Sequence, residues 1–396
     1  MKYIIEDTTL SNIADAIRSK NGESEQYTPE EMATKIEEIE GGGSGGGGYT
    51  SKYRGSSTVG SVGYVVGHEE ELLRDIENGM WIDGTNMFAN VSDFDYSQLS
   101  GKNMKLTNLY GMFQYSNGNL GEIDFSNFDT SEILDFGYMF ANNANTNLKT
   151  LDVTGINTEK GTNFSYMFYD LSNSCILKGL DALKAPKATT LSYMFSEITN
   201  TSLDIDVSGF FMGDENTIVT AARMFRNSRL KSIKLPKTGV ITGNEIFDSL
   251  HIYSILDLSG FVITGTGTEL FAGGRFYGGI ILPDLPNFAS PAIFDSITYI
   301  YRLRFGEGNG FGREYSGTST LNLAYVWKKV KTSAIETNYG GGTYEEAYLE
   351  FVDSLPMNET GYTKNIKLHT TFYNSLSDED KALITDKGYT ITYGTS

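Results

Sequence analysis

The chain of 396 residues carries 50 acidic and 31 basic side chains, which gives a formal net charge of −19 at pH 7. Nucleic acids and anionic membranes repel an acidic surface, so the composition argues against either as the main partner. The single cysteine, Cys175, excludes an intrachain disulfide, and 44 glycines beside 7 prolines predict many tight turns.

The N-terminal residues contain no recognisable secretion signal or membrane span. Only a three-residue apolar stretch precedes Glu6 and Asp7. A secretory signal needs roughly 7–15 consecutive apolar residues and a membrane helix about 20. We therefore expect a protein that is made in the cytoplasm without a signal peptide and does not insert into membranes.

Residues 1–40 are predicted to form a small helical module. Apolar residues recur there at helical spacing, and Thr28-Pro29 followed by Glu31 is typical of a helix start. So short a module buries too little surface to be stable alone, so we expect it to attach to a partner or to self-associate. The candidate attachment residues are Leu10, Ile13, Ile17, Met32, Ile36 and Ile39.

Residues 41–66 are interpreted as a glycine-rich linker, and residues 67–80 as a capping helix. The run GGGSGGGG, which starts at Gly41, has almost no folded-state preference and behaves as a flexible coil. The segment HEEELLRDIENGM, which starts at His68, places acidic residues where the positive end of a helix favours them. A terminal repeat requires such a polar outer face.

A recurring pair of residues organises the remainder of the chain, residues 81–396. The pair is Met-Phe or an equivalent, and it recurs at spacings of 22 to 30 residues, within the range of about 20–30 that is typical of leucine-rich repeats. The pairs are Met87-Phe88, Met112-Phe113, Met139-Phe140, Met167-Phe168, Met194-Phe195, Met224-Phe225, Ile246-Phe247, Leu270-Phe271 and Ile293-Phe294. Between them, LGEIDFSNF, LKTLDVTG, LDIDVSGF, LKSIKLPKTG, YSILDLSGF and YIYRLRFG have the alternation of strands bounded by turns.

These repeats predict an α+β fold, a leucine-rich-repeat solenoid of about ten units. One strand and one turn cannot bury their own apolar face, whereas stacked units bury the Met-Phe pairs in continuous ladders. We expect a parallel strand ladder on one face and short helices or turns on the other. Core packing is the predicted role of every Met-Phe pair.

The repeats resemble the BspA-like leucine-rich repeat family of bacterial and phage surface proteins. FSYMFYDLSN, LSYMFSEITN and LDVTGINTEKGTNFSYMF carry the resemblance. The segment from about residue 343 to residue 396, with Lys387-Gly388-Tyr389, looks like the closing repeats of that family. The resemblance implies a fold and not a ligand, because repeat scaffolds carry many functions.

The N-terminal module is similar to one found on tail, baseplate and fibre proteins of phages and prophages of Gram-positive hosts. LSNIADAIRSKNG followed by YTPEEMA and polyglycine carries this likeness. The resemblance implies a virion component whose residues 1–40 contact other tail or baseplate proteins. Because so small a module is not expected to be stable alone, we also expect a homo-oligomer on the virion. We expect it to act outside the cell.

The sequence contains no motif that predicts catalysis. His68, His251 and His369 have no zinc-binding spacing, and neither GxSxG nor a P-loop occurs. The glycines of residues 306–312 are interpreted as a turn. We therefore predict no enzyme, no cofactor and no metal site, although a carboxylate pair for glycoside hydrolysis stays open among 50 acids.

Ligand binding is predicted on the outward face of the strands. In the frame L-x-x-L-x-L, one outward column contains Asp124, Asp152, Asp206, Lys234, Asp257, Ile281 and Arg304, with Arg302 beside it. Satisfying turn amides is an alternative role for the aspartates, and solvated charge an alternative for the basic residues. The candidate ligand-binding residues are Asp152, Asp206, Lys234, Asp257, Arg302, Arg304 and Tyr301.

An aromatic cluster near these arginines is a second candidate surface. It comprises Tyr299, Tyr301, Tyr325 and Trp327. Tyrosine and tryptophan combine an apolar ring with a polar group and recur at recognition surfaces. Packing within and between repeats is the simpler interpretation.

Three functions are compatible with these patterns. The favoured one is a phage tail-fibre or tail-tip protein that recognises a host cell-surface glycan or protein without catalysis. A bacterial surface adhesin is the first alternative. A tail-associated enzyme that degrades polysaccharide is the second, and residues 306–342 are its nearest candidate for a cleft.

Overall fold

The computed structural model describes residues 63, 65–91, 94–116, 120, 123–143, 148–264, 269–287, 291–300, 302–312, 314, 318–335, 341–359 and 361–395. The module of residues 1–40, with all six candidate attachment residues, lies outside the described residues. So does nearly all of the glycine-rich linker. The domain boundaries drawn from the sequence therefore stay predictions.

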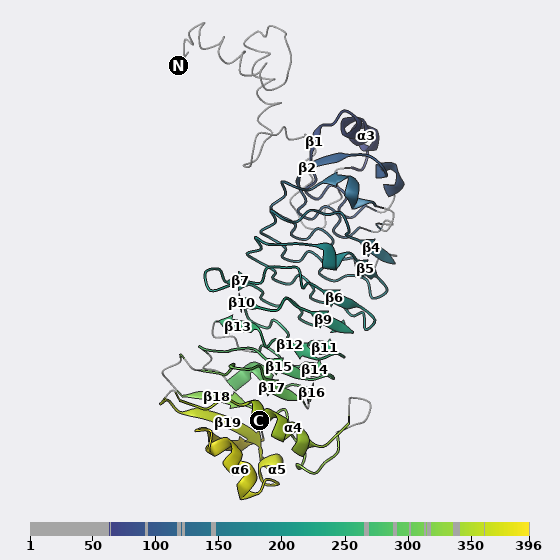
Figure 1. Ribbon diagram of the computed structural model, residues 1–396. Helices are drawn as coiled ribbons and strands as arrows, with labels where there is room; N and C mark the ends of the chain where they lie inside the picture. Colours follow the sequence, from purple (N-terminus) through teal and green to yellow (C-terminus); the bar gives the residue numbers. More distant parts are fainter. Residues whose placement is uncertain are drawn as a thin grey trace, which may run out of the picture.

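The described chain is an elongated α+β structure in which short strands outnumber helices (Figure 1). Its strands form small sheets, and every pairing between named strands is parallel. Four of these sheets, given in the order of pairing, are β1 (Trp81–Asp83), β2 (Met104–Asn108) and β3 (Phe128–Asp129); β4 (Thr150–Asp152) and β5 (Ile176–Lys178); β6 (Asp204–Asp206) and β9 (Ser232–Lys234); and β12 (Leu256–Asp257), β15 (Ile280–Leu282) and β17 (Leu303–Phe305). Two further sheets are β7 (Val219–Thr220), β10 (Gly239–Thr242) and β13 (Phe261–Thr264), and β8 (Arg229–Leu230), β11 (His251–Ile252), β14 (Arg275–Phe276) and β16 (Tyr299–Ile300). The last sheet is β18 (Ser319–Asn322), β19 (Lys364–His369) and β20 (Thr390–Gly394).

Paired strands are about one sequence repeat apart in the chain, except β18 and β19, where Ser319 aligns with Lys364. Ile205 aligns with Ile233, and Val240 aligns with Val262. We call one such repeat of the chain a coil, and the backbone groups of each paired strand are satisfied by the strand of a neighbouring coil. Alternation along a strand then places one set of side chains inward and the other outward.

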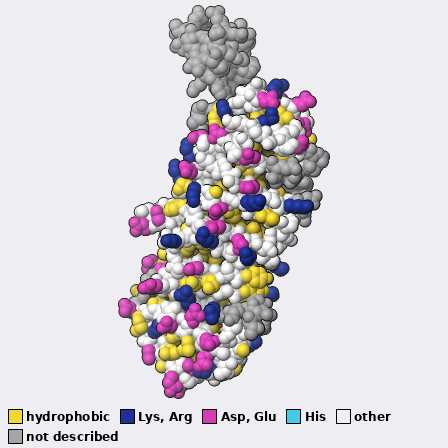
Figure 2. All heavy atoms as spheres, turned by 45° about the vertical axis from the view of Figure 1, so that its right-hand side comes forward, with side chains coloured by type: hydrophobic (Ala, Val, Ile, Leu, Met, Phe, Trp, Pro, Cys, Tyr) yellow, Lys and Arg dark blue, Asp and Glu magenta, His cyan; other side chains and the backbone are white. Residues whose placement is uncertain are grey.

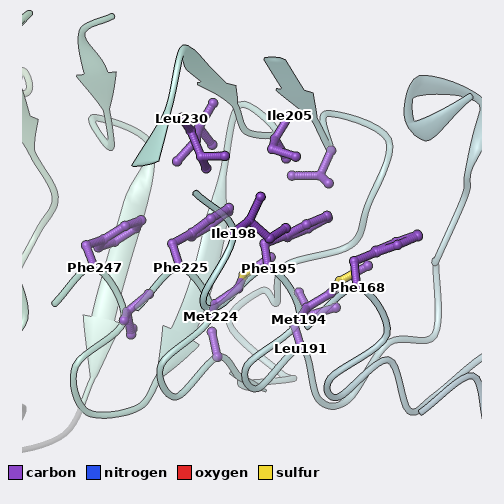
Figure 3. Packing of buried hydrophobic residues seen from close by; sticks show 14 of the residues in the cluster. Phe168, Leu191, Met194, Phe195, Ile198, Ile205, Met224, Phe225, Leu230 and Phe247 are labelled. Atoms are coloured by element: carbon purple, nitrogen blue, oxygen red, sulfur yellow. The ribbon is translucent and has the colours of Figure 1, made fainter. Parts of the chain in front are cut away.

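The repeated phenylalanines form a continuous ring stack through the middle of the structure. From Phe88 to Phe294, neighbouring rings of the stack lie 5.3–5.7 Å apart and within 15° of parallel. Figure 3 shows Phe168, Phe195, Phe225 and Phe247 lying side by side in similar orientations. The partner Met, Ile or Leu of every pair is at most 2% exposed. The predicted core role of the Met-Phe pairs is confirmed.

The turns that carry the pairs from Met87-Phe88 to Leu270-Phe271 have left-handed residues on both sides. In the coil of Met139-Phe140, the flanking Tyr138 and Asn142 have φ angles of 57° and 59°. A left-handed residue other than glycine costs roughly 1–2 kcal/mol. Hydrogen bonds between coils offset this cost, because the amides of Tyr138 and Phe140 donate to carbonyls of the next coil, those of Ser165 and Met167, both at 3.0 Å.

Helices lie mainly at the two ends of the stack (Figure 1). The helix predicted after His68 is present as α3 (Glu69–Glu77), with three glutamates in its first turn. The segment proposed as closing repeats contains α4 (Tyr344–Ser354), α5 (Thr370–Tyr373) and α6 (Asp378–Thr385), and α4 and α6 both begin with capping boxes. The 3₁₀ turns are η1 (Tyr96–Leu99), η3 (Phe125–Asn127), η4 (Leu180–Ala182) and η5 (Pro291–Phe294). Among the described residues, no helix has the length and apolarity to cross a bilayer.

Candidate functional site

The outward strand positions form columns across successive coils, as the repeat frame predicts. Asp206 on β6 is aligned with Lys234 on β9. Asp257 on β12 is aligned with Ile281 on β15, which is aligned with Arg304 on β17. Aligned residues on neighbouring strands are separated by about 4.8 Å. The structure therefore brings these candidate residues into common rows.

One strand that the sequence patterns missed adds a basic residue to this set. Asp152 on β4 is aligned with Lys178 on β5, and Gly179 takes the place of the last apolar residue of the L-x-x-L-x-L frame there. In chain order, acids and bases alternate over the first five positions. We call the whole set the mixed column: Asp152, Lys178, Asp206, Lys234, Asp257, Ile281 and Arg304.

The aspartates of the mixed column stabilise the turns that follow their strands. Asp152, Asp206 and Asp257 each accept a hydrogen bond from the amide two residues further on, at 3.0, 3.0 and 2.9 Å. This is the turn role that the sequence left open. A carboxylate used in this way offers fewer free lone pairs to a ligand.

Asp124 is a correction to the predicted column. It precedes the 3₁₀ turn η3 and accepts a hydrogen bond from the Ser126 amide at 3.0 Å. The segment predicted as a strand there becomes a turn, because the Asp-Phe-Ser sequence can satisfy the turn amides locally. Only its last residues form β3.

The basic candidates lie beside acids. Lys234 contacts Asp206 at 2.7 Å, and Arg302 and Arg304 approach Glu350 of α4 at 3.9 and 3.6 Å. All three basic side chains are about half exposed or more. Exposed pairs of this kind contribute about 0–1 kcal/mol, so a ligand can replace them at little cost.

The predicted aromatic cluster does not form one exposed surface. Trp327 is 0% exposed and packs against Tyr348, Phe351 and Phe372, so core packing is its role. Tyr299 and Tyr325 are half-buried, and Tyr301 lies outside the described residues.

A tyrosine ladder precedes the Met-Phe pairs and was missed from the sequence. Tyr138, Tyr166 and Tyr193 stack with centroid separations of 4.4 Å, and Arg223 covers the last ring at 5.5 Å. Tyr110 contacts Tyr138 at 5.4 Å with its ring tilted by 51°. Burial raises the pKa of Tyr138 and of Tyr166. Because neighbouring rings cover one another's faces, the ladder presents ring edges, which suits stabilisation better than stacking on a sugar.

A second missed feature lies four residues after three of the repeat phenylalanines. Arg229, His251 and Arg275 occupy this position and are aligned on β8, β11 and β14. We call these three residues the basic column. The signal in the sequence is the offset from Phe225, Phe247 and Phe271, which the search for leucine-rich strand patterns does not use.

Sites for chemistry are sparse in the described part of the chain. It contains no cluster of three His, Cys, Asp or Glu side chains that could hold a metal ion. Burial raises the pKa of the Cys175 thiol to about 11, which makes it a poor nucleophile. A shallow groove of about 420 Å³ has only Thr220, Ala222, Arg223, Thr242, Gly243, Asn244 and Thr264 as its described lining. None of these residues is an acid or belongs to residues 306–342.

Comparison with known proteins finds a family match over part of the repeats. Residues 82–210 match the family described as "Mycoplasma protein of unknown function, DUF285", which is a BspA-like repeat family. The predicted BspA-like resemblance is therefore confirmed for these residues. No curated protein and no solved structure matches the chain. The phage-like resemblance of residues 1–40 stays a prediction.

Proposed function

We propose that this protein is a leucine-rich-repeat solenoid that recognises a host cell-surface glycan or protein without turnover, as part of a phage tail fibre or tail tip. The observation that carries the proposal is the parallel register of the coils. It repeats each outward side chain at steps of about 4.8 Å, so that a row of equivalent contacts faces one ligand. Extended repeat surfaces are well suited to binding extended partners.

The N-terminal module would supply the link to the virion. In this proposal the apolar stripes from Leu10 to Ile17 and from Met32 to Ile39 contact other tail or baseplate proteins, and the glycine-rich linker gives reach. Several copies on one particle would turn weak single contacts into strong overall attachment. Homo-oligomerisation on the virion belongs to the same proposal.

A bacterial surface adhesin is the second candidate. It is favoured by one specific observation, the match of residues 82–210 to a family described as a Mycoplasma protein. The two candidates share the binding surface and differ in location. Immunogold labelling separates them, because a tail protein labels purified virions and an adhesin labels the envelope of uninfected cells.

The binding claim is tested with the purified full chain on susceptible and resistant cells. We expect saturable binding to susceptible cells only, and equal binding to both or to neither would contradict receptor recognition. Incubation with purified wall polysaccharide tests the absence of turnover. Release of soluble sugar would contradict a pure binding protein and favour the polysaccharide-degrading alternative.

A further inference from the structure

The basic column combines two exposed arginines with a histidine on the coil between them. Arg229 is aligned with His251, and His251 is aligned with Arg275. The next residues along these strands, Leu230, Ile252 and Phe276, are completely buried. The column therefore points outward, and its two arginines are fixed two strand steps apart, at about 10 Å between their Cα atoms.

No described carboxylate lies within ion-pairing distance of Arg229 or Arg275. By contrast, Lys234, Arg223 and Arg226 each contact an acid at 3.2 Å or less. The contrast is notable because acids outnumber bases by 50 to 31 over the whole chain. Acidic and basic side chains are interspersed along the face drawn in Figure 2. Arg229 and Arg275 are therefore two aligned, exposed cations with no described acid as a partner.

The two arginines affect the pKa of His251, which lies between them. The pKa of its imidazole is lowered to about 4, first by burial and then by the charges of Arg275 and Arg229. At neutral pH the ring is therefore uncharged, and the column carries its positive charge on the two guanidinium groups. A neutral imidazole between them can still offer a hydrogen bond to a ligand.

Two tyrosines extend the basic column on the same side of the coils. Tyr253 and Tyr277 come two residues after His251 and Arg275, and their rings stack at 4.8 Å. Tyr253 is the end ring of this row, so a neighbouring ring of the row covers only one of its faces, and it is 49% exposed. Guanidinium groups bind carboxylates and phosphates through charge-assisted hydrogen bonds, and an exposed aromatic ring packs against the apolar face of a sugar. Cations beside an exposed ring therefore match a ligand that has both features.

We propose that the basic column and the Tyr253–Tyr277 pair bind an anionic glycan polymer, with the anion held between Arg229 and Arg275 and a sugar or polyol segment against Tyr253. The anionic group is a carboxylate or a phosphodiester, which share the required chemistry. This inference rests on the proposed recognition function and names the ligand class.

The test compares two double variants of the full chain that remove the same charge. Arg229→Gln/Arg275→Gln changes the basic column, and Lys187→Gln/Lys237→Gln changes two exposed lysines that lie outside both columns. Binding to poly(glycerol phosphate), to polygalacturonate and to uncharged dextran is measured by calorimetry. We expect the first variant to raise Kd for the bound polymer about tenfold or more, and the control to change it less than about threefold.

Some outcomes of this test identify the anionic group of the ligand, and others overturn the proposal. Binding of only the phosphate polymer, or only the carboxylate polymer, supports the proposal and identifies the anion. Equal weakening by both double variants, equal binding of dextran, or no binding of either polymer overturns it. A Tyr253→Ala variant that binds as tightly as wild type overturns the role of the ring.

Cell binding distinguishes this failure from failure of the proposed function. If wild type and Arg229→Gln/Arg275→Gln bind susceptible cells equally, the basic column is not the site, while receptor recognition stands. If wild type binds the polymer but no cells, receptor recognition fails, while the polymer site stands. Matching melting temperatures of the variants establish that the substitutions leave the fold intact.

Discussion

The mixed column and the basic column both consist of aligned residues on neighbouring parallel strands, but they differ in the charges that are aligned. In the mixed column, Asp206 and Lys234 are aligned and form an ion pair at 2.7 Å. In the basic column, Arg229 and Arg275 flank a neutral histidine and have no described acidic partner. The register of the coils brings like positions together in both columns. The residue types then decide whether aligned charges pair with each other, as Asp206 and Lys234 do, or are presented to a ligand.

The comparison depends on the register, which the phenylalanine stack maintains. Phe195 is completely buried and stacks on Phe168 and Phe225 at 5.4 and 5.6 Å. We expect Phe195→Ala to reduce the free energy of unfolding by about 3–5 kcal/mol, measured by urea denaturation. Phe195→Leu is the control and should cost less than the alanine variant. A loss below about 1 kcal/mol for Phe195→Ala would contradict a central role for the stack.

Placing an acid between the two arginines of the basic column should weaken ligand binding and stabilise the fold. An aspartate at position 251 would lie between Arg229 and Arg275, as Asp206 lies beside Lys234. We expect His251→Asp to weaken binding of the anionic polymer about tenfold or more. At pH 7 it should also raise the free energy of unfolding by about 0.5–1 kcal/mol. His251→Asn is the neutral control, and unchanged polymer binding by His251→Asp would contradict the assignment.

The basic column should also make the protein sensitive to mild acid. The pKa of His251 is about 4 in the folded protein and near 6.5 in an ordinary environment, so the unfolded state binds the proton more readily. The fold therefore loses stability as the pH falls from about 6.5 towards 4.

This contribution can be isolated by comparing unfolding at pH 7 and pH 5. We expect His251→Gln to reduce the loss between the two conditions by about 1 kcal/mol, after allowance for the partial exposure of the ring. An identical loss in wild type and variant would mean that the histidine is not held in its neutral form.

The smallest expected effect concerns the ion pair of the mixed column. A double-mutant cycle on Asp206→Asn and Lys234→Met should give a coupling energy of about 0.2–1 kcal/mol, because both side chains are solvated. Asp206→Ala should reduce the free energy of unfolding by about 1 kcal/mol more than the coupling energy, because it also removes the acceptor of the Ser208 amide. A coupling energy above about 2 kcal/mol would make the pair a larger structural element than its exposure implies.

Much of the stack was predictable from the sequence, because its core positions are identical in type and regular in spacing. The Met-Phe pairs predicted the buried ladder, and the leucine frame predicted the alignment of Asp257, Ile281 and Arg304. The frame failed at Ile176–Lys178, where Gly179 takes the place of the last apolar residue of the L-x-x-L-x-L frame. That omission concealed the alternation of charge in the mixed column.

The basic column could not be recognised from one repeat at a time. Arg229, His251 and Arg275 differ in type and are 22 and 24 residues apart, so only the alignment of three coils brings them together. Trp327 was a candidate for a surface site because its sequence segment is near two arginines. Its ring instead lies in the core. Exposure of an aromatic residue depends on which distant helix packs over it, here α4, which supplies Tyr348 and Phe351.

The imidazole of His251 reports most directly on whether the basic column binds an anion. Its pKa can be followed by NMR in labelled protein, with and without a saturating amount of the bound polymer. An anion between Arg229 and Arg275 would offset their field, so the pKa should rise from about 4 towards its ordinary value of 6.5. An unchanged pKa under saturation would place the polymer elsewhere on the molecule and contradict the proposed site.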